Sequence, residues 1–165
     1  MIVVGTGHRP PRLGLGYDAV SNKRLTLFAE RHLSSLSGVT EVVSGGAQGW
    51  DQAIAHAAIR LKIPLFCVLP FDGMDRKWPE AGRTRFSAIL GRASKVHVCH
   101  TGKVFRASQY IDRDRYMVDY AKGAGRGMLL ALWDGVRDGG TWHTVNYAWA
   151  KELEMKNMWT DWQAG

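Results

Sequence analysis

The stretch "VVSGGAQGWDQAIAHAA", residues 42–58, decides the fold, because three glycines join a β-branched run to an alanine-rich helical pattern. Glycine permits positive φ and lets a ligand approach main-chain N–H groups without a Cβ in the way. The helix start beyond Gly45, Gly46 and Gly49 offers unpaired N–H donors and the positive end of a dipole. The stretch therefore predicts a strand, a tight turn and a helix. The turn is either an anion site, most often for phosphate, or a purely structural connection.

The composition indicates a soluble globular protein. Its 165 residues are 45% apolar and 22% charged, which suits one domain over residues 1–165 with a core of its own. The sequence contains no apolar run of transmembrane length and no charged leader followed by a cleavage site. We therefore expect a cytoplasmic protein without a membrane partner.

The two cysteines do not predict a metal site. Cys67 and Cys99 lie within apolar strand-like runs, so we expect two buried free thiols in a reducing compartment. His97 and Cys99 share one face of their strand, whereas His100 takes the other, and no second cluster completes a ligand set. We predict no metal and no cofactor.

The net charge of +7 raises nucleic acid as a partner. The arginines are scattered in pairs, however, with acidic residues between them, at 9 and 12, 83 and 85, and 113 and 115. Such pairs at loop and helix starts suit a pocket for a phosphorylated small molecule at least as well as a duplex surface. The charge alone does not choose between the two.

Apolar strand-like runs alternate with helical patterns along the chain. We predict strands at 2–5, 40–44, 64–70, 95–99 and 128–133, and a possible edge strand in the tail. We predict one helix that runs from the glycine turn to about residue 62, and further helices at 21–37, 81–92, 110–122 and 142–154. This alternation predicts a Rossmann-like three-layer α/β sandwich, with a mainly parallel sheet covered by helices on both faces.

In such sheets, ligands bind beyond the carboxyl ends of the strands, where the strand order reverses. The residues that follow the predicted strands are therefore the candidate ligand-binding residues: Thr6, Gly7, His8, Arg9, Ser44, Gly45, Gly46, Gln48, Asp51, Asp134, Gly139, Gly140 and Thr141. We expect Gly45, Gly46, Gly139 and Gly140 to lie in one concave site. A phosphate-bearing ligand gives one reason for all these glycines, and the absence of G-x-G-x-x-G argues against an ordinary NAD dehydrogenase.

Four stretches, in order, resemble the SLOG superfamily, which joins DprA proteins to the lysine-decarboxylase-like LOG proteins. They are "GTGHRPPRLG", "VVSGGAQGWDQAIA", "RDRYMVD" and "ALWDGVRDGGTWHTVNYA", and they span roughly residues 2–152. The likeness is greatest to the YpsA-like branch. It implies a Rossmann-like domain that binds nucleotides or nucleotide-derived molecules, and some members cleave the N-glycosidic bond of a nucleoside monophosphate.

The resemblance also implies roles for particular residues. Arg113 and Met117 match the arginine and methionine that LOG enzymes place four positions apart on a helix, so Arg113 would reach the ligand's phosphate or ribose. The alternative is an exposed helix arginine paired with Asp112 or Asp114. The LOG glycine motif is kept at Gly139, Gly140 and Thr141, but Thr144 stands where that motif has its catalytic glutamate, and a threonine cannot do a carboxylate's work.

Other polar residues are candidates for the catalytic role that the glutamate has in the LOG motif. Asp51 is either a helix cap or a contact to ribose. Asp134 follows a strand and is expected in the cleft. His8 is a general acid, a phosphate contact or a loop residue bonded to the backbone. Among the tryptophans, Trp50 or Trp78 could stack on a nucleobase. Trp142 and Trp149 share a helix face, and core or dimer packing is favoured for them.

Three function classes therefore remain. The intact glycine loops favour a protein that binds a nucleotide or nucleotide-derived phosphorylated ligand: a nucleoside monophosphate, an ADP-ribose-like or an NAD-related molecule. The second class is a LOG-type N-glycosidase (phosphoribohydrolase), with Asp134 or Asp51 as the catalytic carboxylate, so enzyme status is open. The third is DprA-like binding of single-stranded DNA, which the charge favours and the lack of a basic–aromatic stripe opposes. The resemblance and the seven tryptophans also predict a homodimer.

Overall fold

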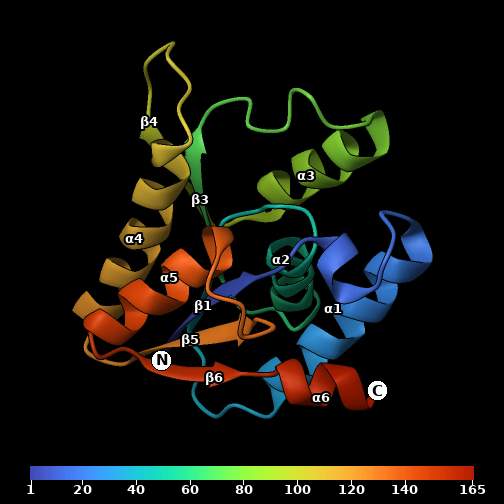
Figure 1. Ribbon diagram of the computed structural model, residues 1–165, viewed down its shortest axis with the longest axis vertical. Coiled ribbons are helices and arrows are strands. Elements are labelled where there is room, and N and C mark those ends of the chain that lie inside the picture. The colour runs from blue at the N-terminus through green and yellow to red at the C-terminus, as the bar shows by residue number, and fades with distance from the viewer.

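The apolar runs of the sequence form one six-stranded sheet in the computed structural model, which describes all residues from 1 to 165 (Figure 1). The strands are β1 (Ile2–Gly7), β2 (Glu41–Ser44), β3 (Leu65–Phe71), β4 (Lys95–His100), β5 (Gly127–Leu132) and β6 (Glu154–Asn157). The helices are the 3-10 turn η1 (Pro10–Leu13), α1 (Ala19–Ser34), α2 (Trp50–Arg60), α3 (Glu80–Arg92), α4 (Ser108–Gly123), α5 (Gly139–Ala150) and α6 (Trp159–Ala164).

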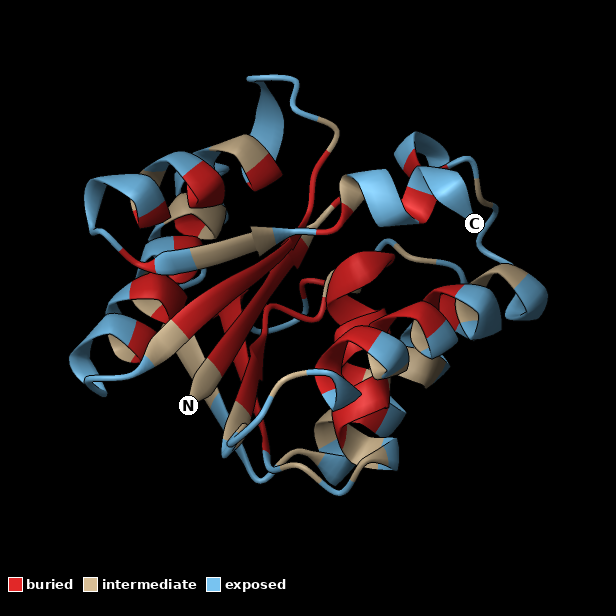
Figure 2. Cartoon of the chain, turned by 90° about the horizontal axis from the view of Figure 1, so that it is seen from below, coloured by how far each residue is buried: buried red, intermediate tan, exposed pale blue.

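All five strand pairings are parallel, in the order β4-β3-β2-β1-β5-β6. The inner strands are buried along most of their length (Figure 2), which explains why they read as continuous apolar runs rather than as alternating patterns. Helices cover both faces of the sheet. The predicted Rossmann-like α/β class is therefore confirmed, and the sheet is parallel throughout.

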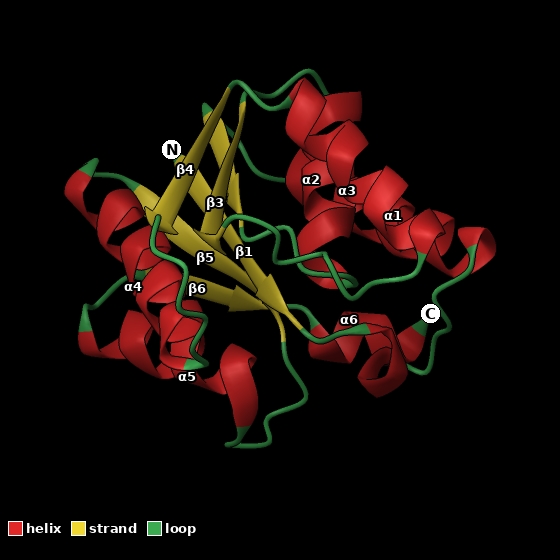
Figure 3. Ribbon diagram, turned by 90° about the horizontal axis from the view of Figure 1, so that it is seen from above, coloured by secondary structure: helices red, strands yellow, loops and turns green.

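Alternate residues of each strand feed two separate cores. Val3 points to the face covered by α1, α2, α3 and α6, whereas Val4 points to the face covered by α4 and α5 (Figure 3). Leu25 of α1 and Ile54 of α2 are fully or almost fully buried in the first core, and Met117 of α4 is buried in the second. Each helix is thus fixed by an apolar face that matches one side of the sheet.

The ends of several elements differ from the prediction. Helix α1 starts two residues earlier than expected, because Asp18 caps it and accepts a hydrogen bond from the Ser21 N–H at 2.9 Å. Helix α5 begins at Gly139 rather than 142, since the glycine pair forms its first turn instead of a loop. It ends at Ala150, which leaves room for the edge strand β6 that the tail was expected to contain. The short helices η1 and α6 were not predicted.

The strand order fixes where a ligand crevice must open. From β1, the chain builds outward through β2, β3 and β4, and it then returns to the other side of β1 with β5. The order therefore reverses between β1 and β5, whose last residues, Gly7 and Leu132, lie side by side. The loops after these two strands diverge at this edge of the sheet.

Other sequence expectations also meet the structure here. Cys67 and Cys99 are both free, as predicted, but only Cys67 is fully buried, and burial raises the pKa of its thiol to about 12. No group of three or more histidine, cysteine, aspartate or glutamate side chains is placed to hold a metal ion. None of the helices combines the length and apolar character that crossing a membrane requires.

Candidate ligand-binding site

A cavity of about 610 Å³ lies at the carboxyl ends of β1 and β5, where the switch in strand order predicts it. Its walls come from the loop after β1, the start of α2, the first half of α4 and the start of α5. Sixteen residues line it: Thr6, Gly7, His8, Arg9, Arg12, Ala47, Asp51, Ala107, Tyr110, Ile111, Arg113, Asp114, Gly139, Gly140, Thr141 and His143.

The start of α5 gives the cavity a group of main-chain donors. Asp138 precedes the helix, but its side chain does not cap it. Gly139 has φ 75°, a conformation that favours glycine, and Gly140 has no other atom within 4 Å of the position a Cβ would occupy. An anion can therefore approach the first-turn N–H groups at the positive end of the helix dipole.

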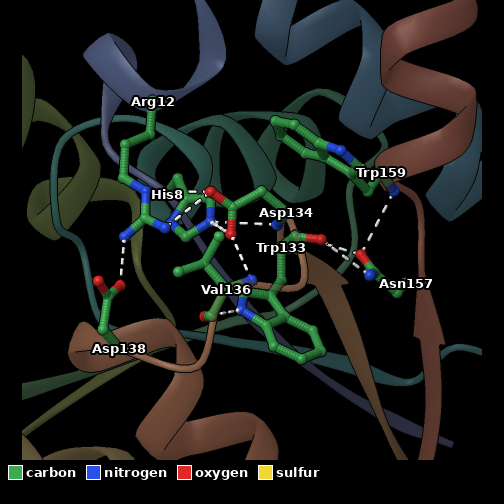
Figure 4. Close-up of polar contacts among 8 residues, drawn as sticks. All are labelled: His8, Arg12, Trp133, Asp134, Val136, Asp138, Asn157 and Trp159. Carbon is green, nitrogen blue, oxygen red and sulfur yellow. Dashed lines mark hydrogen bonds and ion pairs between the residues drawn. The ribbon is translucent and has the colours of Figure 1, made fainter.

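Arg12 joins the two loops that diverge at the switch point (Figure 4). Its Nη2 donates to Asp134 Oδ2 at 2.7 Å and its Nη1 donates to Asp138 Oδ1 at 2.9 Å. The Val136 N–H also donates to Asp134 Oδ1, at 3.0 Å. Burial works to raise the pKa of Asp134, but the hydrogen bonds from Val136, Arg12 and His8 outweigh it and lower the pKa. Asp134 is therefore an ionised anchor for Arg12.

His8 lies against the same carboxylate. Its Nε2 is 3.0 Å from Asp134 Oδ1 and 3.2 Å from the Asp134 main-chain nitrogen, and Trp159 contacts the ring edge-on. Burial lowers the pKa of His8, although Asp134 acts in the opposite direction. Asp134 was expected as a catalytic carboxylate and a ligand contact; its oxygens are bonded to Arg12 and Val136, and it does not line the cavity.

Arg113 and two carboxylates form the buried part of the cavity. Only 4% of the Arg113 surface is exposed; its Nε donates to Asp114 Oδ1 at 2.7 Å and its Nη1 donates to the Gly45 carbonyl at 2.6 Å. Asp51 lies in the first turn of α2 and is 7% exposed. Burial raises the pKa of Asp51 to about 7, against the pull of Arg113. Burial also raises the pKa of Asp114, although Arg113 and the neighbouring Thr144 act to lower it.

The predicted site residues separate into two groups. The residues that line the cavity are Thr6, Gly7, His8, Arg9, Asp51, Arg113, Gly139, Gly140 and Thr141. The residues that do not line it are Ser44, Gly45, Gly46, Gln48 and Asp134. The expectation that all four selected glycines share one concave site is therefore only half right.

The glycine turn after β2 lies behind the cavity wall. A Cβ on Gly45 would collide with the Arg113 guanidinium, and one on Gly46 would lie 2.7 Å from the Phe86 ring. Ser44 Oγ donates to the Asp51 carbonyl at 2.7 Å, and Gln48 is buried beside Gly82. Gly45 and Ser44 thus contact Arg113 and Asp51, and none of the four residues lines the cavity.

The aromatic candidates also need correction. Trp50 is fully buried and donates from Nε1 to the Leu130 carbonyl at 3.2 Å, so it cannot stack on a base. Trp78 packs against Phe86 and does not line the cavity. The aromatic ring in the cavity wall is Tyr110, three residues before Arg113, and helical spacing from Arg113 was the signal that could have found it.

The fold and the cavity define a Rossmann-like α/β protein with a crevice that presents main-chain donors and arginines at the switch point. Residues 3–159 match the model described as the YspA SLOG family (YpsA), and the chain belongs to this family. The resemblance found in the sequence is thereby confirmed. No curated protein matches the chain.

Two solved structures share the fold. DNA processing protein A (DprA) from Streptococcus pneumoniae has a TM-score of 0.65 and 16% identity, over 93% of this chain and 48% of that one. The structural genomics target TM1055 has a TM-score of 0.58 and 14% identity, over 93% of this chain and 71% of that one. The chain thus spans about half the length of DprA.

Proposed function

We propose that the protein binds a nucleotide or a nucleotide-derived phosphorylated ligand in the 610 Å³ cavity. One observation carries this proposal: the open first turn of α5, with Gly139 and Gly140, meets the arginines of the β1 loop in the same cavity. Membership of the SLOG family supports a nucleotide-related or DNA-binding role in general. A nucleoside monophosphate, an ADP-ribose-like or an NAD-related ligand fits this chemistry, and the volume lies within the usual range for small-ligand sites.

The lining residues divide the work of binding. The N–H groups of Gly140 and Thr141 would hold a phosphate, with Arg9 supplying positive charge beside them and Arg12 already paired with Asp134 and Asp138. Tyr110 and Ile111 offer an apolar surface for a base or ribose ring. The ligand therefore has its anionic end at α5 and its rings against α4.

The test measures the binding of nucleoside monophosphates, ADP-ribose and NAD to the protein by thermal shift and by calorimetry. Arg9 is exposed, lines the cavity and makes no salt bridge, so Arg9→Ala removes a ligand contact without a packing defect. We expect affinity to fall about tenfold, as for the loss of one charge-assisted hydrogen bond. Arg83→Ala, which removes an equal charge from the exposed face of α3, should change nothing. If no nucleotide binds, or both variants behave alike, the proposal fails.

A second candidate is an N-glycosidase acting on a nucleoside monophosphate. It is favoured by Asp51, because a carboxyl group whose pKa lies near 7 can both give and take a proton at neutral pH. Chromatography would detect the free base in incubations with each monophosphate. If the protein is such an enzyme, Asp51→Asn should lower turnover by about 10²–10⁴-fold and leave binding measurable. Absence of base release from every substrate would refute it.

Two further proposals concern larger partners. Likeness to a DNA processing protein supports testing single-stranded DNA, whose binding would weaken steeply with added salt.

Homodimer formation is supported by the partly exposed apolar residues Val136 and Trp149, at 48% and 43% exposure. Sedimentation that shows only monomer at tens of micromolar (roughly the range of such assays) would refute the dimer.

A further inference from the structure

The charges of the cavity are divided by depth. Its buried floor holds Asp51, Arg113 and Asp114, none more than 9% exposed, so two carboxylates share one guanidinium. Its mouth holds the exposed Arg9 and Arg12 with the open start of α5. The floor is thus acidic by one charge when both carboxylates are ionised. At the mouth, Asp134 and Asp138 balance Arg12, so Arg9 and the main-chain donors of α5 are what an anion meets there.

The protein does not neutralise this excess by itself. Arg113 is committed to Asp114 at 2.7 Å and to the Gly45 carbonyl at 2.6 Å. No cation lies within salt-bridge distance of Asp51, although its side chain lines the cavity and is more than nine-tenths buried. An ionised carboxylate in such a place is costly unless a partner arrives.

The protonation of Asp51 fits this picture. Burial and the nearby Asp114 raise its pKa to about 7, whereas Arg113, the Ala47 N–H and Arg9 at the mouth oppose the rise. Asp51 is therefore protonated for part of the time at neutral pH. A cationic group of a ligand can take the place of that proton.

The groups around Asp51 suit an organic cation. Only two carboxylates reach the floor, and no third histidine, cysteine or acidic side chain joins them to complete a metal-binding group. Tyr110 lines the same wall, and its ring already faces a guanidinium, with the Arg113 Cζ 5.7 Å from the ring centroid. A cavity lined by both an aromatic ring and a buried carboxylate suits a flat, positively charged ring.

We propose that the floor selects nucleotides whose base carries a positive charge, such as an N-ribosylated pyridinium, with the ring on Asp51 and Tyr110 and the phosphate at α5. This inference rests on the proposed nucleotide binding and adds the charge class of the base. The ligand is then a dipolar molecule whose cation matches the acidic floor and whose phosphate matches Arg9 and the start of α5.

The experiment compares nicotinamide mononucleotide with its 1,4-dihydro form, because the two share the ribose phosphate and differ in the charge of the ring. At pH 7.5, we expect calorimetry to give at least about tenfold tighter binding of the cationic form, the effect of one charge-assisted contact. Asp51→Asn should reduce this preference to about twofold or less. Asp72→Asn, on an exposed loop after β3, should keep the full preference.

A second measurement uses the unaltered protein, so the test does not depend on the variant folding. Calorimetry in buffers of different ionisation enthalpy should show release of more protons, near pH 7, with the cationic nucleotide than with the neutral one. The phosphate, Arg9, Arg113 and Asp114 are present in both titrations, so the difference reports on Asp51.

Three results would overturn the inference while leaving nucleotide binding intact. They are equal affinity for the two forms with equal proton release, a preference that survives in Asp51→Asn, and recovery of tight binding of the neutral form by added Mg²⁺. If neither form binds and the wider nucleotide panel is also silent, the proposed function itself is wrong and the charge preference falls with it.

Discussion

The two glycine-rich turns beside the cavity resemble each other in sequence and differ in their surroundings. Gly45 and Gly49 are buried, and a Cβ at either would meet the Arg113 guanidinium or the His8 carbonyl. Gly139 and Gly140 are exposed, and no neighbour occupies the space beside Gly140. Glycines in the first turn allow protein groups to pack closely, whereas those in the second leave main-chain donors open. Counting glycines therefore does not identify the turn that faces a ligand.

Arg113→Ala should have the largest effect on stability. The substitution leaves Asp114 buried without its cation and the Gly45 carbonyl without its donor, which typically costs about 3–5 kcal/mol of the free energy of unfolding. Urea unfolding of the variant provides the measurement.

A double substitution sharpens this result. If Gly45 is glycine because of Arg113, then Gly45→Ala should be strongly destabilising alone and much less so in the Arg113→Ala background. Additive effects of the two changes would show that Gly45 is needed for another reason.

Gly49→Ala should come next. Gly49 has φ 99°, and its Cβ would lie 2.5 Å from the His8 carbonyl oxygen, a backbone atom that cannot move aside. Strained backbone and overpacking together should cost about 2–4 kcal/mol. Gly140→Ala is the matched control, for which thermal unfolding should show a change within about 0.5 kcal/mol. Equal losses at the two positions would erase the distinction between the turns.

Asp51→Asn should have the smallest effect, and one that depends on pH. The pKa of Asp51 is about 7 in the folded protein and near 3.8 when unfolded, so between these values the folded state binds more protons. Its contribution to the free energy of unfolding therefore falls as pH rises from 3.8 to 7. The asparagine variant lacks this fall, and its stability relative to the parent should increase by about 2–3 kcal/mol from pH 5 to pH 8. Urea unfolding at the two pH values would reveal a constant difference if Asp51 is ionised throughout.

The sequence predicted the sheet and the edge at which the cavity opens, because apolar period and strand–helix alternation are local patterns. It could not show that Asp134 is paired within the protein, since its partner Arg12 is 122 residues away in the chain. Trp50 was misread for a similar reason: its position beside a glycine turn suggested a ligand, but the Leu130 carbonyl accepts its N–H. Long-range pairing decides these roles, and no local pattern records it.

The contacts of Arg12 with Asp134 and Asp138 bear on how fast a ligand binds. By holding Asp134 and Asp138 at once, Arg12 fixes the β1 loop to the start of α5 before any ligand arrives. A mouth that is already formed spares the ligand the entropy of ordering two loops and the delay of a closing motion. Ligand association should then be a single step, with a rate proportional to ligand concentration and no plateau at saturation.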